Sequence, residues 1–165
     1  MLKFLFFKIL VEAHFYCFFE KLTYNNLMKN LPANLSLYFD GSCLPKNPGG
    51  IAGYGWQIED AEKNTLFSDS GEVCRGPEAT NNIAEWAAVC NGIKFLIDNR
   101  WTGQLQIFGD SQLVINQING IYKVKKDTLI PYHQKCMKML SGLNWSADWI
   151  PREKNDACDK LSKLR

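Results

Sequence analysis

The chain has 165 residues, a length typical of one domain or at most two. Hydrophobic residues make up 46% and charged residues 22%, which excludes a disordered or collagen-like protein. The formal charge of +2 is too small by itself to indicate a nucleic-acid-binding protein, but the charge is unevenly distributed. Residues 36–119 hold ten acidic and five basic side chains, and residues 120–165 hold five acidic and ten basic ones. This pattern predicts a cation-binding site beside a surface that binds phosphates.

The N-terminal segment differs in composition from the rest of the chain. Residues 1–24 contain eight of the 21 aromatic side chains, but Lys8, Glu12 and His14 interrupt them, and no secretory signal pattern follows. Three interpretations remain open: a helix packed on the domain, an interfacial helix, or upstream sequence translated ahead of a start at Met28. We treat residues 1–34 as an appendage and residues 35–165 as the functional domain. Because every motif lies after it, we expect the segment before Met28 to be dispensable for cleavage.

From residue 35 the chain predicts alternating strands and helices. Apolar runs predict strands at Leu35–Phe39, Ile51–Ile58, Leu66–Val73, Leu105–Phe108 and Trp145–Trp149, with a turn at Asp40–Gly41 and a hairpin through Glu59–Asn64. Helical spacing predicts helices at 82–97 with Asn82 as N-cap, at Ser111–Ile118, at Thr128–Leu140 with Pro131 in its first turn, and from Asn155 onward. This order predicts one α/β domain with a mixed sheet and helices packed on it.

Six cysteines, at positions 17, 43, 74, 90, 136 and 158, form no C-x-x-C pair. The two histidines, His14 and His133, are not placed to complete a zinc site with them. We therefore expect reduced, mostly buried thiols in a cytoplasmic protein. Cys43 is expected to be a small packed side chain, and His133 an ordinary, partly exposed residue of a helix.

Four acidic residues stand at the ends of predicted elements: Asp40, Glu85, Asp110 and Asp159. Each has an ordinary structural explanation. Asp40 can start a turn, Glu85 can complete a capping box, Asp110 can cap a helix, and Asp159 can pair with Lys163 at i, i+4. Together they favour a site, because carboxylates that converge at strand ends repel one another unless a hard cation such as Mg²⁺ lies among them.

At this point the sequence resembles a known family. The motifs, in chain order, are FDGSC (39–43), NPGG (47–50), GYGW (53–56), TNNIAE (80–85), FGDSQLVI (108–115) and NDACDKL (155–161). Together they resemble type 1 ribonuclease H over about four-fifths of the chain. The resemblance implies the ribonuclease H fold, a five-stranded mixed sheet flanked by helices, in a catalytic domain at residues 35–165. It also implies endonucleolytic cleavage of the RNA strand of an RNA–DNA hybrid.

By the same resemblance, the four metal-binding acids of the family fall on Asp40, Glu85, Asp110 and Asp159. Two Mg²⁺ ions, or Mn²⁺ in their place, are implied with substrate bound, and the products carry 5′-phosphate and 3′-hydroxyl ends. Asp40 would bridge both ions and Asp159 would help to hold the ion on the side of the attacking water. Glu85 and Asp110 would hold the ion that faces the leaving oxygen.

The resemblance also implies substrate-binding residues, since such an enzyme reads the shape of the hybrid and its 2′-hydroxyls. The implied hybrid contacts, with Thr80 touching a phosphate, are Asn47, Thr80, Asn81, Asn82 and Gln112. The basic protrusion of some members is absent, and Lys123, Lys125 and Lys126 are the nearest substitute, although a short lysine run also suits a solvated surface.

The sequence departs from many members of the family before its last helix. The loop is shortened to Pro151–Asn155 and lacks the histidine thought to help proton transfer or product release. This resembles the archaeal-like subgroup, in which an arginine occupies the loop. Arg152 is the arginine here, and by this resemblance we count it among the substrate-binding residues. The departure concerns proton shuttling rather than cleavage.

Two rival interpretations keep the same fold: a non-catalytic module that binds hybrids, and an integrase- or resolvase-like nuclease. The complete set of four acids argues against the first, and the amides suited to 2′-hydroxyl readout argue against the second. We expect a monomer without stable membrane association.

Overall fold

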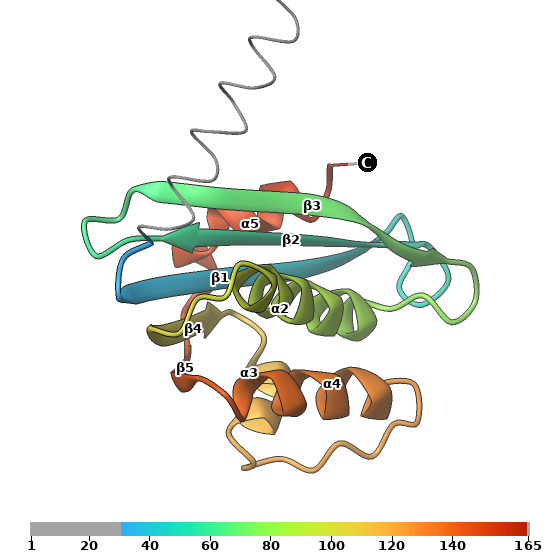
Figure 1. The fold of residues 1–165 in the computed structure, drawn as a ribbon. Coiled ribbons are helices and arrows are strands. Elements are labelled where there is room, and N and C mark those ends of the chain that lie inside the picture. The colour runs from blue at the N-terminus through green and yellow to red at the C-terminus, as the bar shows by residue number, and fades with distance from the viewer. Residues whose placement is uncertain (1–30, 165) are drawn as a thin grey trace, which may run out of the picture. The chain divides into compact units, whose positions relative to one another are not determined.

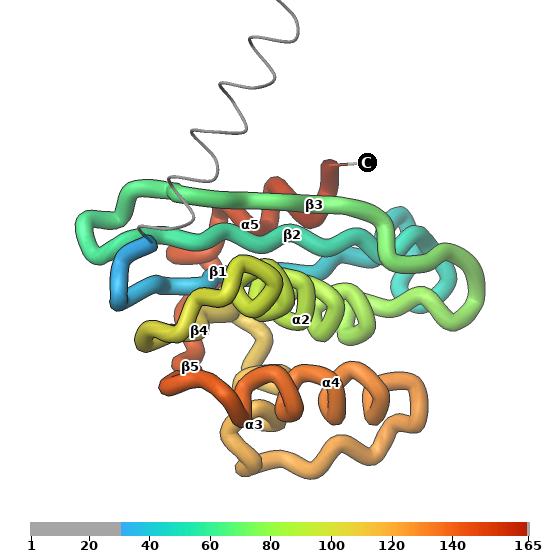
Figure 2. Tube along the Cα trace, in the orientation of Figure 1, coloured from blue at the N-terminus to red at the C-terminus, as the bar shows by residue number. Residues whose placement is uncertain are grey.

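The structure, a computed structural model, describes residues 31–164, and those from Pro32 onward belong to one compact unit (Figures 1 and 2). The expectations for the N-terminal segment, for His14 and for Cys17 lie outside the described residues. The elements in chain order are β1 (Asn34–Leu44), β2 (Ile51–Glu59), β3 (Thr65–Arg75), α2 (Asn81–Asp98), β4 (Gln104–Gly109), α3 (Gln112–Ile118), α4 (Ile130–Leu140), β5 (Asn144–Trp149), the short 3₁₀ helix η1 (Arg152–Lys154) and α5 (Asp156–Leu161). Within residues 31–164, no helix is both long and apolar enough to cross a membrane.

The five strands form one sheet in the order β3-β2-β1-β4-β5. β1 pairs antiparallel with β2 and parallel with β4; β2 and β3 are antiparallel, and β4 and β5 are parallel. The predicted five-stranded mixed sheet is therefore confirmed. β1 is the central strand, so the residues it carries lie in the middle of the sheet.

The two faces of the sheet are covered by different helices. In Figure 1, α2 lies in front of the sheet and α5 behind it. Leu35, Leu37 and Phe39 alternate along β1 and are almost fully buried, as are Trp86 and Ile93 of α2. The hydrophobic core therefore fills the space between the sheet and α2, and the side chains at alternate β1 positions face α5.

Glycines let both helices approach the central strands closely. A Cβ atom on Gly41 of β1 would lie 2.1 Å from the backbone nitrogen of Glu85 in α2. On the opposite face, a Cβ atom on Gly55 of β2 would lie 2.6 Å from the Cβ of Leu161 in α5. These approaches place the second turn of α2 and the end of α5 on either side of Asp40.

Two local predictions are wrong. The chain does not turn at Asp40–Gly41, because β1 continues to Leu44 and these two residues pair with Gly55 and Tyr54 of β2. The N-cap of α2 is Thr80 rather than Asn82, since the Thr80 hydroxyl accepts a hydrogen bond from the backbone N–H of Ile83 (3.3 Å).

Other predictions hold. α4 carries Pro131 in its first turn. The five described cysteines are free, and four of them are buried, including Cys43, whose thiol donates to the carbonyl of Lys46 (3.1 Å). His133 is partly exposed on α4 and makes an edge-to-face contact with Trp86, with ring centroids 5.5 Å apart.

Candidate metal centre

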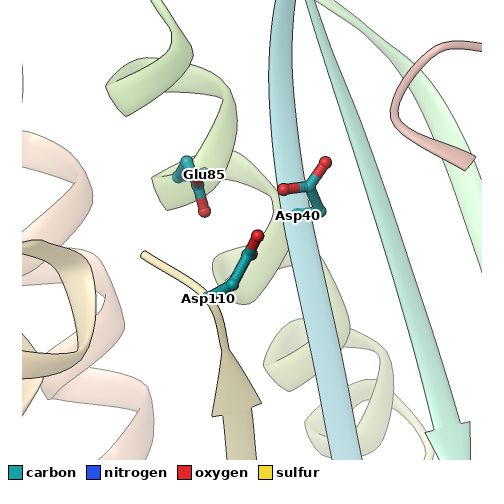
Figure 3. A group of neighbouring side chains, drawn as sticks. All are labelled: Asp40, Glu85 and Asp110. Carbon is teal, nitrogen blue, oxygen red and sulfur yellow. The ribbon is translucent and has the colours of Figure 1, made fainter. Parts of the chain in front are cut away.

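Three carboxylates meet where β1, α2 and the end of β4 come together (Figure 3). Asp40 lies within β1, Glu85 in the second turn of α2, and Asp110 directly after β4. One carboxylate oxygen from each residue lies within 4.8 Å of the others. Three residues spread over 70 positions of the sequence therefore form one compact acidic group.

Burial makes this group costly to ionise without a cation. Asp40 is 5% exposed and Glu85 is 9% exposed. Burial, together with the charges of Asp110 and Asp159, raises the pKa of Asp40 to about 6 against the lowering effect of a hydrogen bond from Ser162. Burial, followed by the charges of Asp40 and Asp110, raises the pKa of Glu85 well above its ordinary value. The repulsion expected from the sequence is thus present.

The donor set fits a hard divalent cation. Its ligand atoms are all carboxylate oxygens, the type that Mg²⁺ prefers in proteins. The Oε2 atom of Glu85 is buried and has no hydrogen-bond partner among the described residues. Such an atom is expensive to bury unless something compensates its charge, and a cation among the three carboxylates would do so.

Two polar side chains near the C-terminus orient the carboxylates. The Ser162 hydroxyl donates to Oδ2 of Asp40 (2.8 Å). Nδ2 of Asn155, a residue only 2% exposed, donates to Oδ1 of Asp110 (2.9 Å) and to the carbonyl of Phe39 (2.8 Å). Sequence reasoning missed both roles. The only available signal was their spacing on the last helix, four residues before and three residues after Asp159.

Asp159 lies close to this group but is bound to cationic side chains. Its Oδ1 accepts from Arg152 (2.5 Å) and its Oδ2 from Lys163 (2.5 Å). Burial acts to raise the pKa of Asp159, but the hydrogen bonds from Lys163 and Arg152 outweigh it, and the net shift is downward. The pairing with Lys163 is the i, i+4 contact anticipated from the sequence, and Asp159 is not one of the three residues whose oxygens meet within 4.8 Å.

The ordinary structural explanations fail for the other three acids. Asp40 is in mid-strand rather than at a turn, and the helix after Asp110 has Ser111 as its N-cap. Glu85 completes no capping box, because the N-cap is Thr80. Among the four acids, only Asp159 has the structural partner that the sequence suggested.

The residues expected to contact substrate lie in four places: the start of α2, the start of α3, the loop between α3 and α4, and η1. Four of them gather at the start of α2: Asn47, Thr80, Asn81 and Asn82, with the Asn47 side chain accepting from the backbone N–H of Asn81 (3.2 Å). Gln112 is exposed at the first residue of α3, two positions after Asp110. Lys123, Lys125 and Lys126 are exposed on the loop between α3 and α4. Arg152 is exposed in η1 beside Asp159.

Comparison with known proteins assigns the chain to a family. The model of a family described as reverse transcriptase-like matches residues 38–165. The N-terminal RNase H domain of Rv2228c from Mycobacterium tuberculosis superposes with a TM-score of 0.71 at 27% identity, covering 78% of this chain and 90% of that one. The chain belongs to this ribonuclease H-like family. Its fold is accordingly the ribonuclease H fold that the motifs implied.

Further relatives agree with this family membership. Ribonuclease HI of the archaeon Halobacterium salinarum is 31% identical over 130 residues, which are 76% of this chain and 60% of that protein. LC11-RNase H1 in complex with an RNA/DNA hybrid has a TM-score of 0.69 at 31% identity, covering 77% of this chain and 92% of that one. The full bifunctional protein Rv2228c is 30% identical over 117 residues, which are 70% of this chain. The match spans only 31% of the length of that protein.

Proposed function

We propose that this protein is a ribonuclease H, an endonuclease that hydrolyses the RNA strand of RNA–DNA hybrids by two-metal-ion catalysis. One observation carries the proposal: the oxygens of Asp40, Glu85 and Asp110 converge within 4.8 Å, and the second oxygen of Glu85 has no partner among the described residues. The 31% identity to LC11-RNase H1, a protein solved with an RNA/DNA hybrid, supports the choice of substrate.

The four acids divide the work of holding the ions. When bound, two Mg²⁺ ions, or Mn²⁺, supply a nucleophile at neutral pH and neutralise charge that develops on the phosphodiester. Asp40, on the central strand and close enough to the other three acids to interact with their charges, would hold both ions. Glu85 and Asp110 would hold the ion on the side of the leaving 3′ oxygen, and Asp159 the ion on the side of the attacking water. The products would carry 5′-phosphate and 3′-hydroxyl ends.

Asp159 can take this role only by exchanging its present partners. Lys163 and Arg152 lower the pKa of Asp159, so its carboxylate is ionised. Their contacts with its two oxygens also orient the carboxylate. Arg152 is 69% exposed, so its guanidinium can leave Asp159 for a substrate phosphate. We assign Arg152 to substrate binding on that basis.

Hybrid recognition would use the start of α2 and the lysine loop. The Oδ1 atom of Asn81 is buried without a hydrogen-bond partner among the described residues, which leaves an acceptor for a donor such as a 2′-hydroxyl. Asn47 is bonded to the backbone beside it, and Asn82 and Gln112 add further amide groups near the carboxylates. Thr80, Lys123, Lys125 and Lys126 would contact phosphates.

The test offers the full chain three matched substrates with Mg²⁺: an RNA–DNA hybrid, duplex RNA and duplex DNA. We expect cleavage of the hybrid alone, in its RNA strand, with 3′-hydroxyl ends that a polymerase can extend, and none in EDTA. Binding of the hybrid without cleavage would identify a non-catalytic module instead. Cleavage of duplex DNA would identify an integrase- or resolvase-like nuclease.

We further propose that the protein acts as a monomer in the cytoplasm, without stable membrane association. The five free cysteines among the described residues support a reducing compartment. Sedimentation of the purified protein and fractionation of its host cells test these two points separately.

A further inference from the structure

A cavity of about 470 Å³ opens on the face of the sheet that carries α5, outside the group of three carboxylates. Its floor includes Gln57, Tyr38 and Phe108, which are neighbours across β2, β1 and β4. α5 presses against the part of this face formed by Gly53 and Gly55. The aromatic pair lies beyond that contact and remains only half-buried.

The aromatic pair provides a surface for a flat ring. The rings of Tyr38 and Phe108 stack with centroids 5.1 Å apart and an interplanar angle of 27°. Half-exposed aromatic side chains on adjacent strands are a common platform for bases, because every base has a π-face that can extend such a stack. The floor of the cavity therefore suits a planar aromatic group.

The rim of the cavity carries cations. Lys63, from the turn between β2 and β3, and Lys154 of η1 both border it and are exposed. Neither forms a salt bridge with another of the residues that the structure describes. The carboxylate at the rim, Glu59, already accepts a hydrogen bond from Nε2 of Gln57 (2.6 Å). The two free ammonium groups leave a net positive rim that suits an anion.

A residue that lines the same cavity, Asn155, carries an unsatisfied acceptor. Asn155 is 2% exposed and uses Nδ2 to donate to Phe39 and Asp110. Its Oδ1 atom is buried and has no hydrogen-bond partner among the described residues. Buried oxygens of this kind are normally paired, so the position calls for a donor such as the N–H of a base.

From these features we infer that the cavity is a nucleotide-binding site, which takes a planar base against Tyr38 and Phe108 and a phosphate between Lys63 and Lys154. The volume lies within the range of small-molecule sites in proteins. The site is separate from the proposed catalysis, and binding there does not require the chain to be a nuclease. Asn155 joins the two, since the same side chain borders the cavity and positions Asp110.

The experiment is calorimetric titration of the full chain with AMP in EDTA, so that no divalent ion can attach the phosphate to the carboxylates. We expect AMP to bind with a dissociation constant below about 5 mM, and adenosine and ribose 5-phosphate to bind at least about tenfold more weakly, because each lacks one half of the ligand. A 5′-phosphorylated dinucleotide distinguishes the sources: tighter binding than AMP indicates the end of a strand, and weaker binding a free nucleotide.

Substitutions locate the binding. Lys63→Ala and Lys154→Ala should each raise the dissociation constant for AMP at least about threefold, and Tyr38→Leu about tenfold. Lys160→Ala is the matched control, because this exposed lysine of α5 pairs with Asp156 and does not line the cavity. If Tyr38→Leu fails to fold, the two lysine variants decide. Binding of AMP no tighter than ribose 5-phosphate, or unchanged affinity in both lysine variants, overturns the proposal.

Discussion

Asp110 combines a side-chain contact, a backbone contact and an electrostatic effect on both other acids of the group. Its carboxylate accepts from Asn155, its backbone carbonyl accepts from Nε1 of Trp149 (3.0 Å), and its charge raises the pKa of both Asp40 and Glu85. A change of this one side chain therefore alters the electrostatics of the whole group without emptying space in the core.

Asp110→Asn should abolish cleavage but stabilise the metal-free protein. The amide can still accept from Asn155, but it removes a charge that holds an ion, so hybrid cleavage should slow about a thousandfold or more. The lost repulsion on Asp40 and Glu85 should raise the melting temperature in EDTA. Mg²⁺ should then raise the melting temperature of the wild type more than that of the variant.

The control for this substitution is Asp98→Asn, an exposed acid paired with Lys94 at the end of α2. It should change neither activity nor the response to Mg²⁺. A variant Asp110→Asn that cuts hybrid at the wild-type rate would remove Asp110 from the site. An inactive variant that melts far lower without metal would make its role structural.

Asn155→Ala should weaken metal binding beyond its effect on stability. It leaves the Phe39 carbonyl and Asp110 without their buried donor, at a cost of about 1–3 kcal/mol. Loss of an orienting partner should weaken Mn²⁺ affinity, measured by calorimetry, about tenfold or more. Asn119→Ala is the matched control, since Nδ2 of Asn119 donates to the carbonyl of Ala147 (2.9 Å); it should lose stability and keep its Mn²⁺ affinity. Equal affinities in the two variants would contradict the positioning role.

Among the elements, β1 and α2 pack so closely at Gly41 that this position has no room for a side chain. Gly41→Ala would place a Cβ atom 2.1 Å from the backbone nitrogen of Glu85 and 2.5 Å from the carbonyl carbon of Ala84. Because both obstacles are backbone atoms, α2 must move, and we expect unfolding free energy to fall by about 3 kcal/mol in urea denaturation. Gly142→Ala, where nothing lies within 4 Å, should change stability by less than about 0.5 kcal/mol.

The loop between α3 and α4 is attached to the core by a chain of polar contacts. Nε1 of Trp86 donates to Oε1 of Gln117 (3.2 Å), and Nε2 of Gln117 donates to the carbonyl of Lys123 (3.5 Å). Gln117 is 4% exposed, so the start of the lysine run is attached to a fixed point of the buried core.

Replacing Lys123, Lys125 and Lys126 together by Ala should weaken hybrid binding and flatten its salt dependence. Each lost phosphate contact should reduce the slope of log affinity against log salt by about 0.9, measured by fluorescence anisotropy at several salt concentrations. Lys94→Ala, on a lysine already paired with Asp98, should leave the slope unchanged. An unchanged slope in the triple variant would make the run an ordinary solvated surface.

Sequence patterns predicted the elements better than their ends. Apolar runs and the helical spacing of apolar residues identified the five strands and α2, because the periodicity of apolar residues reports burial directly. The turn predicted at Asp40–Gly41 is wrong because the glycine has a different purpose here. Gly41 has no side chain, and this lets α2 pack closely against β1. The N-cap of α2 is Thr80 rather than Asn82, because several neighbouring residues could cap this helix and tertiary structure selects one of them.

For the candidate site, spacing and resemblance named the acids, but not their partners. The convergence of Asp40, Glu85 and Asp110 required only that their elements be adjacent. The ion pair between Asp159 and Arg152 depends on the path of η1, which the sequence does not reveal. The hydrogen bond from Asn155 to Phe39 joins residues that are 116 positions apart. Long-range polar contacts of this kind leave no local pattern in the sequence.

At the scale of the molecule, the acidic group makes the metal-free protein less stable as pH rises. The folded-state pKa of Asp40 is about 6, and the pKa of Glu85 is raised well above its ordinary value, so both exceed the values of an unfolded chain. Protonation therefore favours the folded state, and this contribution is lost as pH rises from about 4 through 6. Asp40 alone corresponds to about 3 kcal/mol. The lowered pKa of Asp159 acts oppositely, but only below its ordinary value of 3.8.

Thermal melts in EDTA should therefore show a decline in melting temperature between about pH 4 and pH 7, and Mg²⁺ should restore most of it at the upper end. The double variant Asp40→Asn with Glu85→Gln should lose this decline, because it has no buried acid left to ionise at either position. A melting temperature that rises over this interval in the wild type without metal would contradict the assigned pKa shifts.

The central position of β1 also bears on how the protein opens. β1 pairs with β2 over Ser36–Leu44, which includes Asp40, and with β4 over Asn34–Phe39, whereas β3 and β5 lie at the borders of the sheet. Local fraying begins at such borders and costs less than global unfolding. Amide hydrogens of β3 and β5 should therefore exchange with deuterium soonest, and the amide of Asp40 among the latest. The acid that we propose to hold both ions would thus be carried by the part of the chain that opens least often.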